Sequence, residues 1–260
     1  MVAGFLVICM AGSAIAQDPS IRKRAWEGDS VAMLELSEAF TFGRGVEKKA
    51  DSAMFYLKKS ADKGHPDAQF LLGTELLVNV FSASIYAKGV ALLKKAADKG
   101  HVDAQYRLSE VYRSKGRGDV SDTYHDPKKA YQYGEMAARQ GLPEALMYCA
   151  EARLAGTGAP VNDSLACAFF RRAADENGYV PAVIRMGDMY FEGKATGEAE
   201  PFIAVEWYGR ALGMPHSNID QRGLAHAGIH RVDQFFKRIQ NTYLDANPAM
   251  PMGMFCYKIR

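Results

Sequence analysis

Apolar and small side chains recur three and four residues apart along most of this chain, which predicts amphipathic α-helices. The first clear helix begins after Gly28 and is expected to end in the Gly43-Arg44-Gly45 turn, because glycine supplies the backbone angles of a helix end. A second helix follows and stops at Gly64, and Pro66 suits the first turn of a third. No useful length alternates with period two, so we predict no strands.

One stretch of the chain occurs twice. Residues 57–69 read LKKSADKGHPDAQ and residues 93–105 read LKKAADKGHVDAQ, with 36 residues between equivalent positions. A match of this length at a fixed offset marks an internal repeat. A glycine followed four residues later by alanine then recurs at five places: Gly28–Ala32, Gly64–Ala68, Gly100–Ala104, Gly141–Ala145 and Gly178–Ala182.

The register predicts five helix-turn-helix units, preceded by a partial unit and followed by a segment of different pattern. We expect a signal peptide over 1–16, repeats over 17–213, a C-terminal capping helix within 214–246 and a tail over 247–260. One helical pair cannot bury its apolar faces alone, so neighbouring pairs stack into a continuous core. The capping helix is expected to use apolar residues at helical spacing: Leu224, Ile229, Val232, Phe235, Phe236 and Ile239.

Two units depart from this pattern. The second replaces its glycine turn with LLVNVFSASIYAKG, where Phe81, Ile85 and Tyr86 either fill the core or form an exposed patch, and filling is the commoner outcome. The third carries extra polar residues within 113–130, with Tyr124 near the end. Insertions in solenoids project from one edge and often contact partners, although a solvated loop without a role is equally compatible.

The composition is that of a globular protein and gives no reason to expect nucleic-acid binding. Hydrophobic residues at 48% and charged residues at 24% are ordinary for a globular protein, and a net charge of +2 gives no support for nucleic-acid binding. Residues 1–16 are apolar and end in Ala14-Ile15-Ala16, a cleavage signature of exported proteins, although no basic residue precedes them. We expect an exported bacterial protein, periplasmic or secreted, without a membrane span and monomeric.

The derived unit resembles the Sel-one-like repeat, a relative of the tetratricopeptide repeat. The fourth and fifth units carry its small and aromatic positions: Ala145, Gly156, Gly158, Val161, Asp163, Ala166, Phe169, Phe170, Ala173, Ala174, Gly187, Tyr190, Gly193, Trp207 and Tyr208. The resemblance covers about residues 20–213 and implies an all-α, right-handed α-solenoid that binds a protein or peptide. Exported bacterial members are similar to envelope regulators and adaptors, and alternatively to immunity-type inhibitors of secreted toxins.

Binding in such a solenoid is expected on the outward positions of the first helix of each pair. Positions three and six residues after the leading alanine share one helical face. The sixth positions are mostly acidic, and the third are mixed: Glu38, Thr74, Glu110, Glu151 and Asp188, beside Glu35, Leu71, Arg107, Tyr148 and Arg185. With Tyr124 from the insertion, these residues predict a groove that favours a basic or mixed-charge partner segment; a solvated helix face is the alternative.

Catalytic chemistry has little support in the sequence. The glycine turns follow no strand and lack a following Gly-Lys-Ser/Thr, so they do not form a phosphate loop. His226 and His230, four residues apart with Asp233 beyond, suggest a zinc site only weakly, because Ala227 replaces the glutamate of a zinc-peptidase helix. We therefore expect no catalytic residue, metal or cofactor, and a hydrolase or metal-dependent enzyme that uses this histidine pair is the remaining alternative to a binding protein.

Three cysteines remain after signal removal, which leaves at least one thiol unpaired. Cys149 and Cys167 flank the Gly156-Thr157-Gly158 turn at similar distances and would lie at similar heights in a helical hairpin. A disulfide between them is possible in an oxidising compartment, and two buried thiols are equally compatible.

Overall fold

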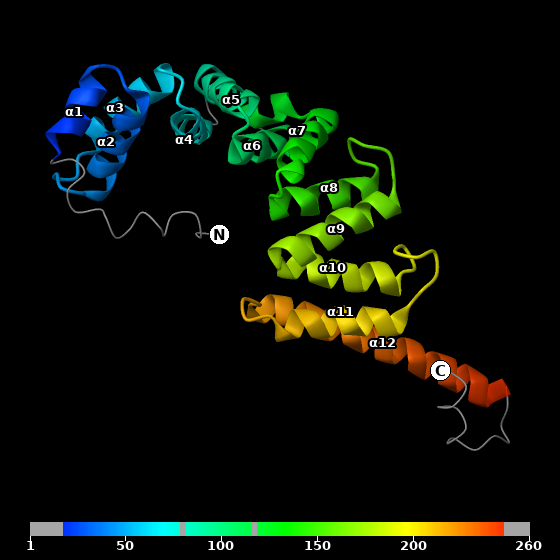
Figure 1. Ribbon diagram of the computed structural model, residues 1–260. Coiled ribbons are helices and arrows are strands. Elements are labelled where there is room, and N and C mark those ends of the chain that lie inside the picture. Colours follow the sequence, from blue (N-terminus) through cyan, green and yellow to red (C-terminus); the bar gives the residue numbers. More distant parts are fainter. Residues whose placement is uncertain (1–17, 79–81, 116–118, 247–260) are drawn as a thin grey trace. The chain divides into compact units, whose positions relative to one another are not determined.

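The computed structural model describes residues 18–78, 82–115 and 119–246, and these residues form helices without strands (Figure 1). The predicted signal peptide over 1–16, Phe81 and the predicted tail over 247–260 lie outside the described residues. The helices are α1 (Pro19–Trp26), α2 (Ser30–Phe42), α3 (Ala50–Asp62), α4 (Pro66–Leu77), α5 (Ala83–Asp98), α6 (Val102–Arg113), the 3-10 helix η2 (Val120–Tyr124), α7 (Pro127–Arg139), α8 (Pro143–Ala155), α9 (Asp163–Asn177), α10 (Val180–Phe191), α11 (Pro201–Gly213) and α12 (Ile219–Ala246). The all-α repeat prediction is confirmed.

The chain divides into two compact units, residues 1–140 and 141–260. In the first unit α2 pairs with α3, α4 with α5 and α6 with α7; in the second α8 pairs with α9 and α10 with α11. Each pair begins with the helix that carries the leading alanine of its repeat. The leading alanines Ala32, Ala68, Ala104, Ala145 and Ala182 are all fully buried, because a small side chain is required where two helices approach closely.

Helix ends follow the expected turn chemistry. The Asp29 carboxylate accepts the backbone N–H groups of Val31 and Ala32 at the start of α2. Gly43 ends α2 with a φ of 73°, a left-handed conformation that glycine adopts without strain. Proline occupies the first turn of α4, where its missing N–H costs no hydrogen bond.

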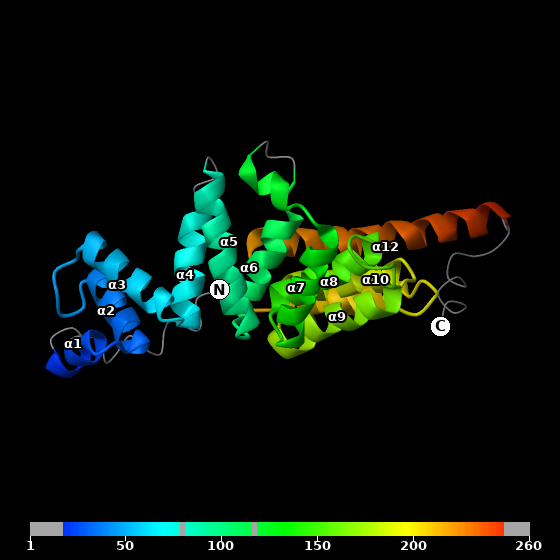
Figure 2. The same ribbon diagram turned by 90° about the horizontal axis from the view of Figure 1, so that it is seen from above.

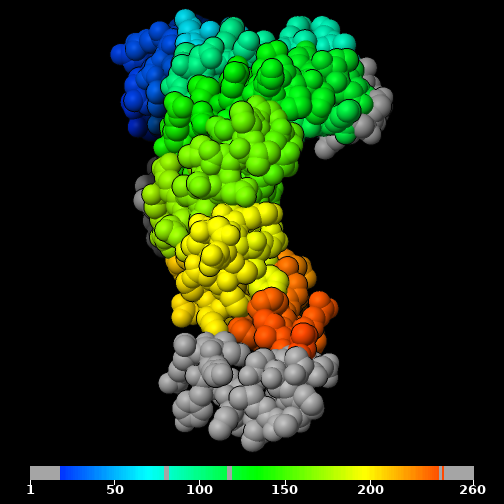
Figure 3. Space-filling model, turned by 90° about the vertical axis from the view of Figure 1, so that its right-hand side faces the viewer, coloured from blue at the N-terminus to red at the C-terminus, as the bar shows by residue number. Residues whose placement is uncertain are grey.

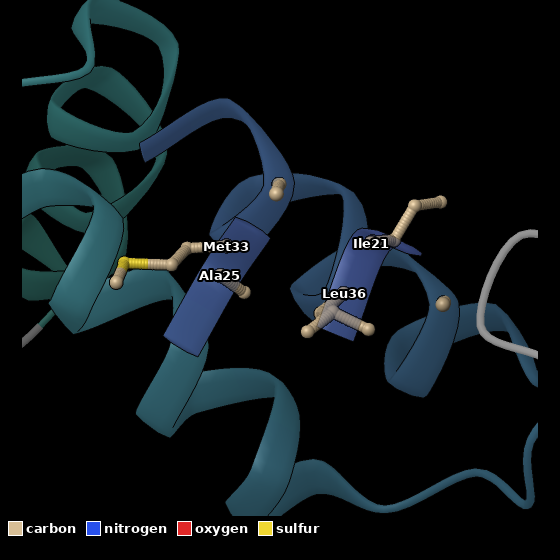
Figure 4. Packing of buried hydrophobic residues seen from close by; sticks show 6 residues of the cluster. Ile21, Ala25, Met33 and Leu36 are labelled. Atoms are coloured by element: carbon tan, nitrogen blue, oxygen red, sulfur yellow. The ribbon is translucent and has the colours of Figure 1, made fainter. Parts of the chain in front are cut away.

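Helix α1 closes the N-terminal end of the first core. Ile21 and Ala25 of α1 pack against Met33 and Leu36 of α2 (Figure 4). The partly buried Tyr56 of α3 packs against the same cluster. Burying a leucine such as Leu36 contributes roughly 1.5–3 kcal/mol. The partial N-terminal unit therefore covers an apolar face that the first complete pair would otherwise expose.

The copied stretch forms the joints between successive helix pairs in the first unit. Buried Gln69, at the start of α4, donates from Nε2 to the carbonyl of Ala61 near the end of α3, 3.2 Å away. Gln105 donates in the same way to the carbonyl of Ala97, also at 3.2 Å. Each bond pairs a buried amide N–H group that would otherwise cost free energy, whereas the Oε1 atom of Gln69 is buried without a hydrogen-bond partner among the described residues.

The second pair fills its core with an aromatic residue. Tyr86 of α5 is buried, as the core-filling alternative predicts, whereas Ile85 is partly exposed. Helices α4 and α5 cross with almost no space between their backbones, because a Cβ on Gly89 would lie 2.9 Å from the carbonyl oxygen of Gly73. Figure 2 shows α4, α5 and α6 side by side.

Helix α12 caps the second unit by packing against α10 and α11 (Figure 3). Ala225 and Val232 are buried, but Leu224 is 60% exposed, Ile239 is 40% exposed and Phe235 is 36% exposed, so the prediction that these three residues close the core is wrong. The buried face is shifted around the helix because the close contact with α11 falls on a glycine.

That contact is a tyrosine ring enclosed by two glycines. The ring of Tyr208, on α11, is fully buried, and a Cβ on either Gly187 of α10 or Gly228 of α12 would lie 2.5 Å from its Cε1 atom. No side chain is tolerated at such a distance without movement of the ring. The packing of α10, α11 and α12 around this ring therefore requires glycine, with no Cβ atom, at both Gly187 and Gly228.

We predict that Gly228→Ala lowers the free energy of unfolding by about 1–3 kcal/mol, because the added methyl overlaps the enclosed ring. Gly223→Ala, five residues earlier on α12, is the matched control: its Cβ would have no neighbour within 4 Å. This control should be neutral or stabilise by up to ~1 kcal/mol through helix propensity. Urea denaturation followed by circular dichroism measures both. Equal unfolding midpoints for the two variants would contradict the packing described.

Candidate partner-binding site

A pocket of about 330 Å³ lies in the first unit where α4 ends, α5 begins and α6 meets the inserted segment. Its lining is mostly polar and charged: Leu77, Tyr86, Arg107, Glu110, Val111, Arg113, Ser114, Lys115 and Ser121. Two of these, Arg107 and Glu110, belong to the face that the sequence predicts for binding. We call this cavity the α6 pocket.

The charged side chains of the α6 pocket are linked to one another. Arg107 Nη1 donates to Glu110 Oε2 at 2.8 Å, and Arg113 Nη2 lies 3.8 Å from Glu110 Oε1. The Nε of Arg107 is buried without a hydrogen-bond partner among the described residues. With Lys115, the pocket carries three cationic groups around one carboxylate, so its net charge is positive.

The insertion in the third unit forms one wall of this pocket. Asp119 accepts the backbone N–H of Ser121 at the start of η2, 2.7 Å away, and Ser121 is buried. The Tyr124 ring lies 5.3 Å from the Tyr86 ring, between centroids. The described part of the insertion therefore packs on α5 and α6, and the alternative of a wholly solvated loop is wrong.

Sequence spacing alone missed some of the pocket residues. Arg113 lies three residues after Glu110, so extending the same face by one more step would have found it. Tyr86 and Ser121 gave no such signal, because the folded insertion brings them to the pocket.

Elsewhere in the first unit, the predicted acidic residues are paired with arginines. Arg24 Nη2 donates to Glu35 Oε2 at 3.0 Å, and Arg44 Nη1 lies 3.8 Å from Glu38 Oε2. Burial raises the pKa of Glu38 above its ordinary value, although Arg44 acts in the opposite direction. These carboxylates are therefore less available to a partner than their position suggests.

In the second unit the predicted residues have different surroundings. Tyr148 is buried within α8, so its expected place on an open binding face is wrong. Glu151 is exposed and forms no ion pair with another described residue. Arg185 Nη1 donates to Asp188 Oδ2 at 3.2 Å, which repeats the spacing of Arg107 and Glu110.

Asp188 binds the capping helix α12 and does not lie on an open groove. Its side chain is 14% exposed, and its Oδ1 accepts from the Tyr208 hydroxyl at 2.8 Å and from the Arg231 guanidinium of α12. Burial, followed by the bond to Asp188, raises the pKa of Tyr208 well above its usual range. The predicted role of Asp188 in partner binding is corrected, because the chain's own α12 already occupies this carboxylate.

Comparison with protein families agrees with the repeat register. The model of the Sel1 repeat matches residues 30–65, 66–101, 102–142, 143–178 and 180–213. The chain belongs to the Sel1 repeat family.

Sel1 repeat proteins are typically protein-interaction scaffolds. This Sel1 repeat protein is similar to the crystal structure of a Sel1 repeat protein from Oxalobacter formigenes, with 22% identity, a TM-score of 0.58, and coverage of 79% of this chain and 80% of the other. That likeness supports the fold alone. Comparison with the curated proteins gives no match.

Two further solved structures are more distantly similar. A protective antigen of uropathogenic Escherichia coli has 22% identity and a TM-score of 0.45, covering 92% of this chain and 60% of the other. The immunity protein Pa5087 of Pseudomonas aeruginosa has 17% identity and a TM-score of 0.42, covering 85% and 74%. Scores this low add nothing to the functional argument.

The two described cysteines of the Sel1 repeat protein are buried thiols. Cys149 on α8 and Cys167 on α9 are not joined by a disulfide, so the structure corresponds to the second alternative. Burial raises the pKa of the Cys167 thiol, which lowers its reactivity. Cys256 lies outside the described residues.

The histidines on α12 form no metal site with their neighbours. Asp233 pairs with Lys237 at 2.8 Å, and His230 Nε2 lies 3.4 Å from Gln234 Nε2. Within residues 18–246 where the structure describes them, no three His, Cys, Asp or Glu residues gather in a way that could hold a metal ion. In the same part of the chain, no helix is both long and apolar enough to cross a membrane.

We predict that Asp188→Asn lowers the free energy of unfolding by about 1–3 kcal/mol, because it weakens hydrogen bonds from Tyr208 and Arg231. Glu151→Gln is the control, since Glu151 occupies the equivalent repeat position but is exposed. Its unfolding midpoint in urea should match that of the unmodified chain. A neutral Asp188→Asn variant would show that α12 is held by apolar contacts alone.

Proposed function

We propose that this chain is a non-catalytic scaffold of the bacterial cell envelope that binds a protein or peptide partner at the α6 pocket. The observation that carries the proposal is the pocket itself, where a folded insertion adds a wall to the face of α6 predicted for binding. Insertions that pack against a repeat face, rather than extending into solvent, enlarge the surface available for recognition.

The charged side chains of the pocket indicate which charges a partner segment should carry. The sequence suggested an acidic row, but Glu110 lies between Arg107 and Arg113, and Lys115 adds a further cation. A segment of mixed charge fits this arrangement, with a carboxylate directed at the cationic groups and a donor directed at Glu110. Partly buried pairs of this kind give specificity because a mismatched charge is costly there.

Other parts of the predicted face extend the proposal. Glu35 and Glu38 in the first unit, and Glu151 and Arg185 in the second, remain proposed contacts outside the pocket. Tyr124 contributes through its position against Tyr86 rather than as a free aromatic side chain. The leader over 1–16 supports export to the periplasm or beyond, and we propose a monomer as the active form.

We predict that Glu110→Lys weakens partner binding at least ~10-fold, equivalent to ~1.4 kcal/mol, because it leaves four cations and no carboxylate in the pocket. The full chain is expressed in its own cell, and the mature form from Gln17 is captured with its partners for identification by mass spectrometry. The affinity of the identified partner is then measured by titration calorimetry.

Glu75→Lys is the matched control, since Glu75 is exposed on α4 in the same unit, lies outside the pocket lining and undergoes the same charge change. It should leave the affinity unchanged. Equal affinity of the Glu110→Lys variant would refute the pocket assignment, and a turnover of substrate by the captured complex would refute the non-catalytic assignment. Capture of a toxin whose activity the chain blocks would identify an immunity-type inhibitor instead of an adaptor.

A further inference from the structure

A second depression in the first unit lies between the second helices of two successive pairs. It has a volume of about 490 Å³ and is formed by α3 and α5, with α4 as its base. Its lining combines leucine and isoleucine side chains with lysines: Lys58, Asp62, Leu72, Leu76, Ile85, Lys88, Ala91, Leu92 and Lys95. We call it the α3–α5 groove; it shares no lining residue with the α6 pocket.

The base of the groove is apolar and is not fully covered by the chain. Leu72 is buried, whereas Leu76, Ile85 and Leu92 are only partly buried. Leu76 and Leu92 belong to the edge of the core cluster that contains Leu34, Ala61 and Leu72. A partner side chain that entered the groove would therefore extend an existing core, and the burial of its apolar surface away from water would favour binding.

The rim of the groove is basic. Lys58 on α3 and Lys88 and Lys95 on α5 are exposed and form no ion pair with another described residue. Asp62 is the one acidic residue of the lining, so three ammonium groups face one carboxylate. Lysine stems cover apolar surface while their charged ends stay in water, which suits a rim around an apolar base.

Apolar and basic residues alternate along α5 in a single stripe. Ile85, Lys88, Leu92 and Lys95 are spaced by three and four residues, so they lie on one helical face. A partner helix presents its own side chains at the same spacing, and an apolar row flanked by carboxylates would match this stripe. Helix-in-groove recognition of this kind relies on anchors at three and four residue intervals.

We propose that the α3–α5 groove docks an acidic amphipathic helix of a partner protein. The apolar side chains of that helix enter between Leu76 and Leu92, and its carboxylates pair with Lys58, Lys88 and Lys95. This surface is additional to the α6 pocket and does not depend on what the pocket binds. The chain then presents two recognition surfaces of different chemistry within residues 58–121.

The test uses a phage-displayed library of 18-residue helical peptides selected on the full immobilised chain. The library has a fixed leucine face, and the flanking positions vary among glutamate, glutamine and lysine. We expect selection to enrich glutamate over lysine at least 10-fold. The double variant K88E/K95E should abolish or reverse that enrichment.

The matched control is K59E/K94E, which changes the net charge by the same amount at exposed lysines of α3 and α5 that lie outside the groove lining. It should retain glutamate enrichment, and circular dichroism verifies that both double variants remain folded. Absence of enrichment on the unmodified chain, or equal loss in both double variants, would overturn the proposal.

The variant R113E/K115E separates this inference from the proposed function. Glutamate enrichment that is lost in R113E/K115E and kept in K88E/K95E would place the acidic peptide in the α6 pocket and overturn the groove proposal alone. The groove could instead bind a second copy of this chain or a membrane, and each has its own test. If light scattering shows a dimer that K88E/K95E dissociates, the occupant is a second copy of the chain. If no peptide is enriched, and the chain sediments with phosphatidylglycerol vesicles but the K88E/K95E variant does not, the occupant is a membrane surface. Either result overturns the proposal.

Discussion

The side-chain amide that closes each joint between helix pairs is the interaction on which the first unit depends. The carbonyl of Ala61 accepts both the N–H of Gly64 and the Nε2 of Gln69, and the carbonyl of Ala97 accepts in the same way from Gly100 and Gln105. The turn and the following helix are thus fixed to one carbonyl. These two bonds fix the angle between the last helix of one pair and the first helix of the next. That angle determines which helix faces line the α6 pocket and the α3–α5 groove.

Sequence reasoning gave the fold because the joint residues are local. Glycines, leading alanines and the copied stretch all act within one repeat, so their spacing identifies each helix pair. The sequence predicted a capping helix within 214–246, and α12 occupies Ile219–Ala246, but the face of this helix that is buried was not predicted correctly. Tyr208 requires a glycine from α12, and periodicity of large apolar residues cannot reveal a contact defined by a missing side chain.

The candidate site was predicted less well than the fold, because its charges depend on contacts between residues far apart in the sequence. Counting positions within each repeat identified Arg107 and Glu110 but treated every acidic residue as free. Asp188 is bound by Arg231, which lies 43 residues further along the chain, and Glu35 is bound by Arg24 from the partial unit. The charge of a surface is set by such pairs, which only the folded chain brings together.

The compactness of the joint has a consequence for how such chains change length during evolution. Donor, acceptor and turn glycine all lie within thirteen contiguous residues, so a genetic duplication beginning and ending inside that stretch adds one helix pair together with a complete joint. Additions of 36 residues therefore leave no interface broken. The third unit carries its extra residues between the two helices of its pair, where new specificity can arise without disturbing the stack.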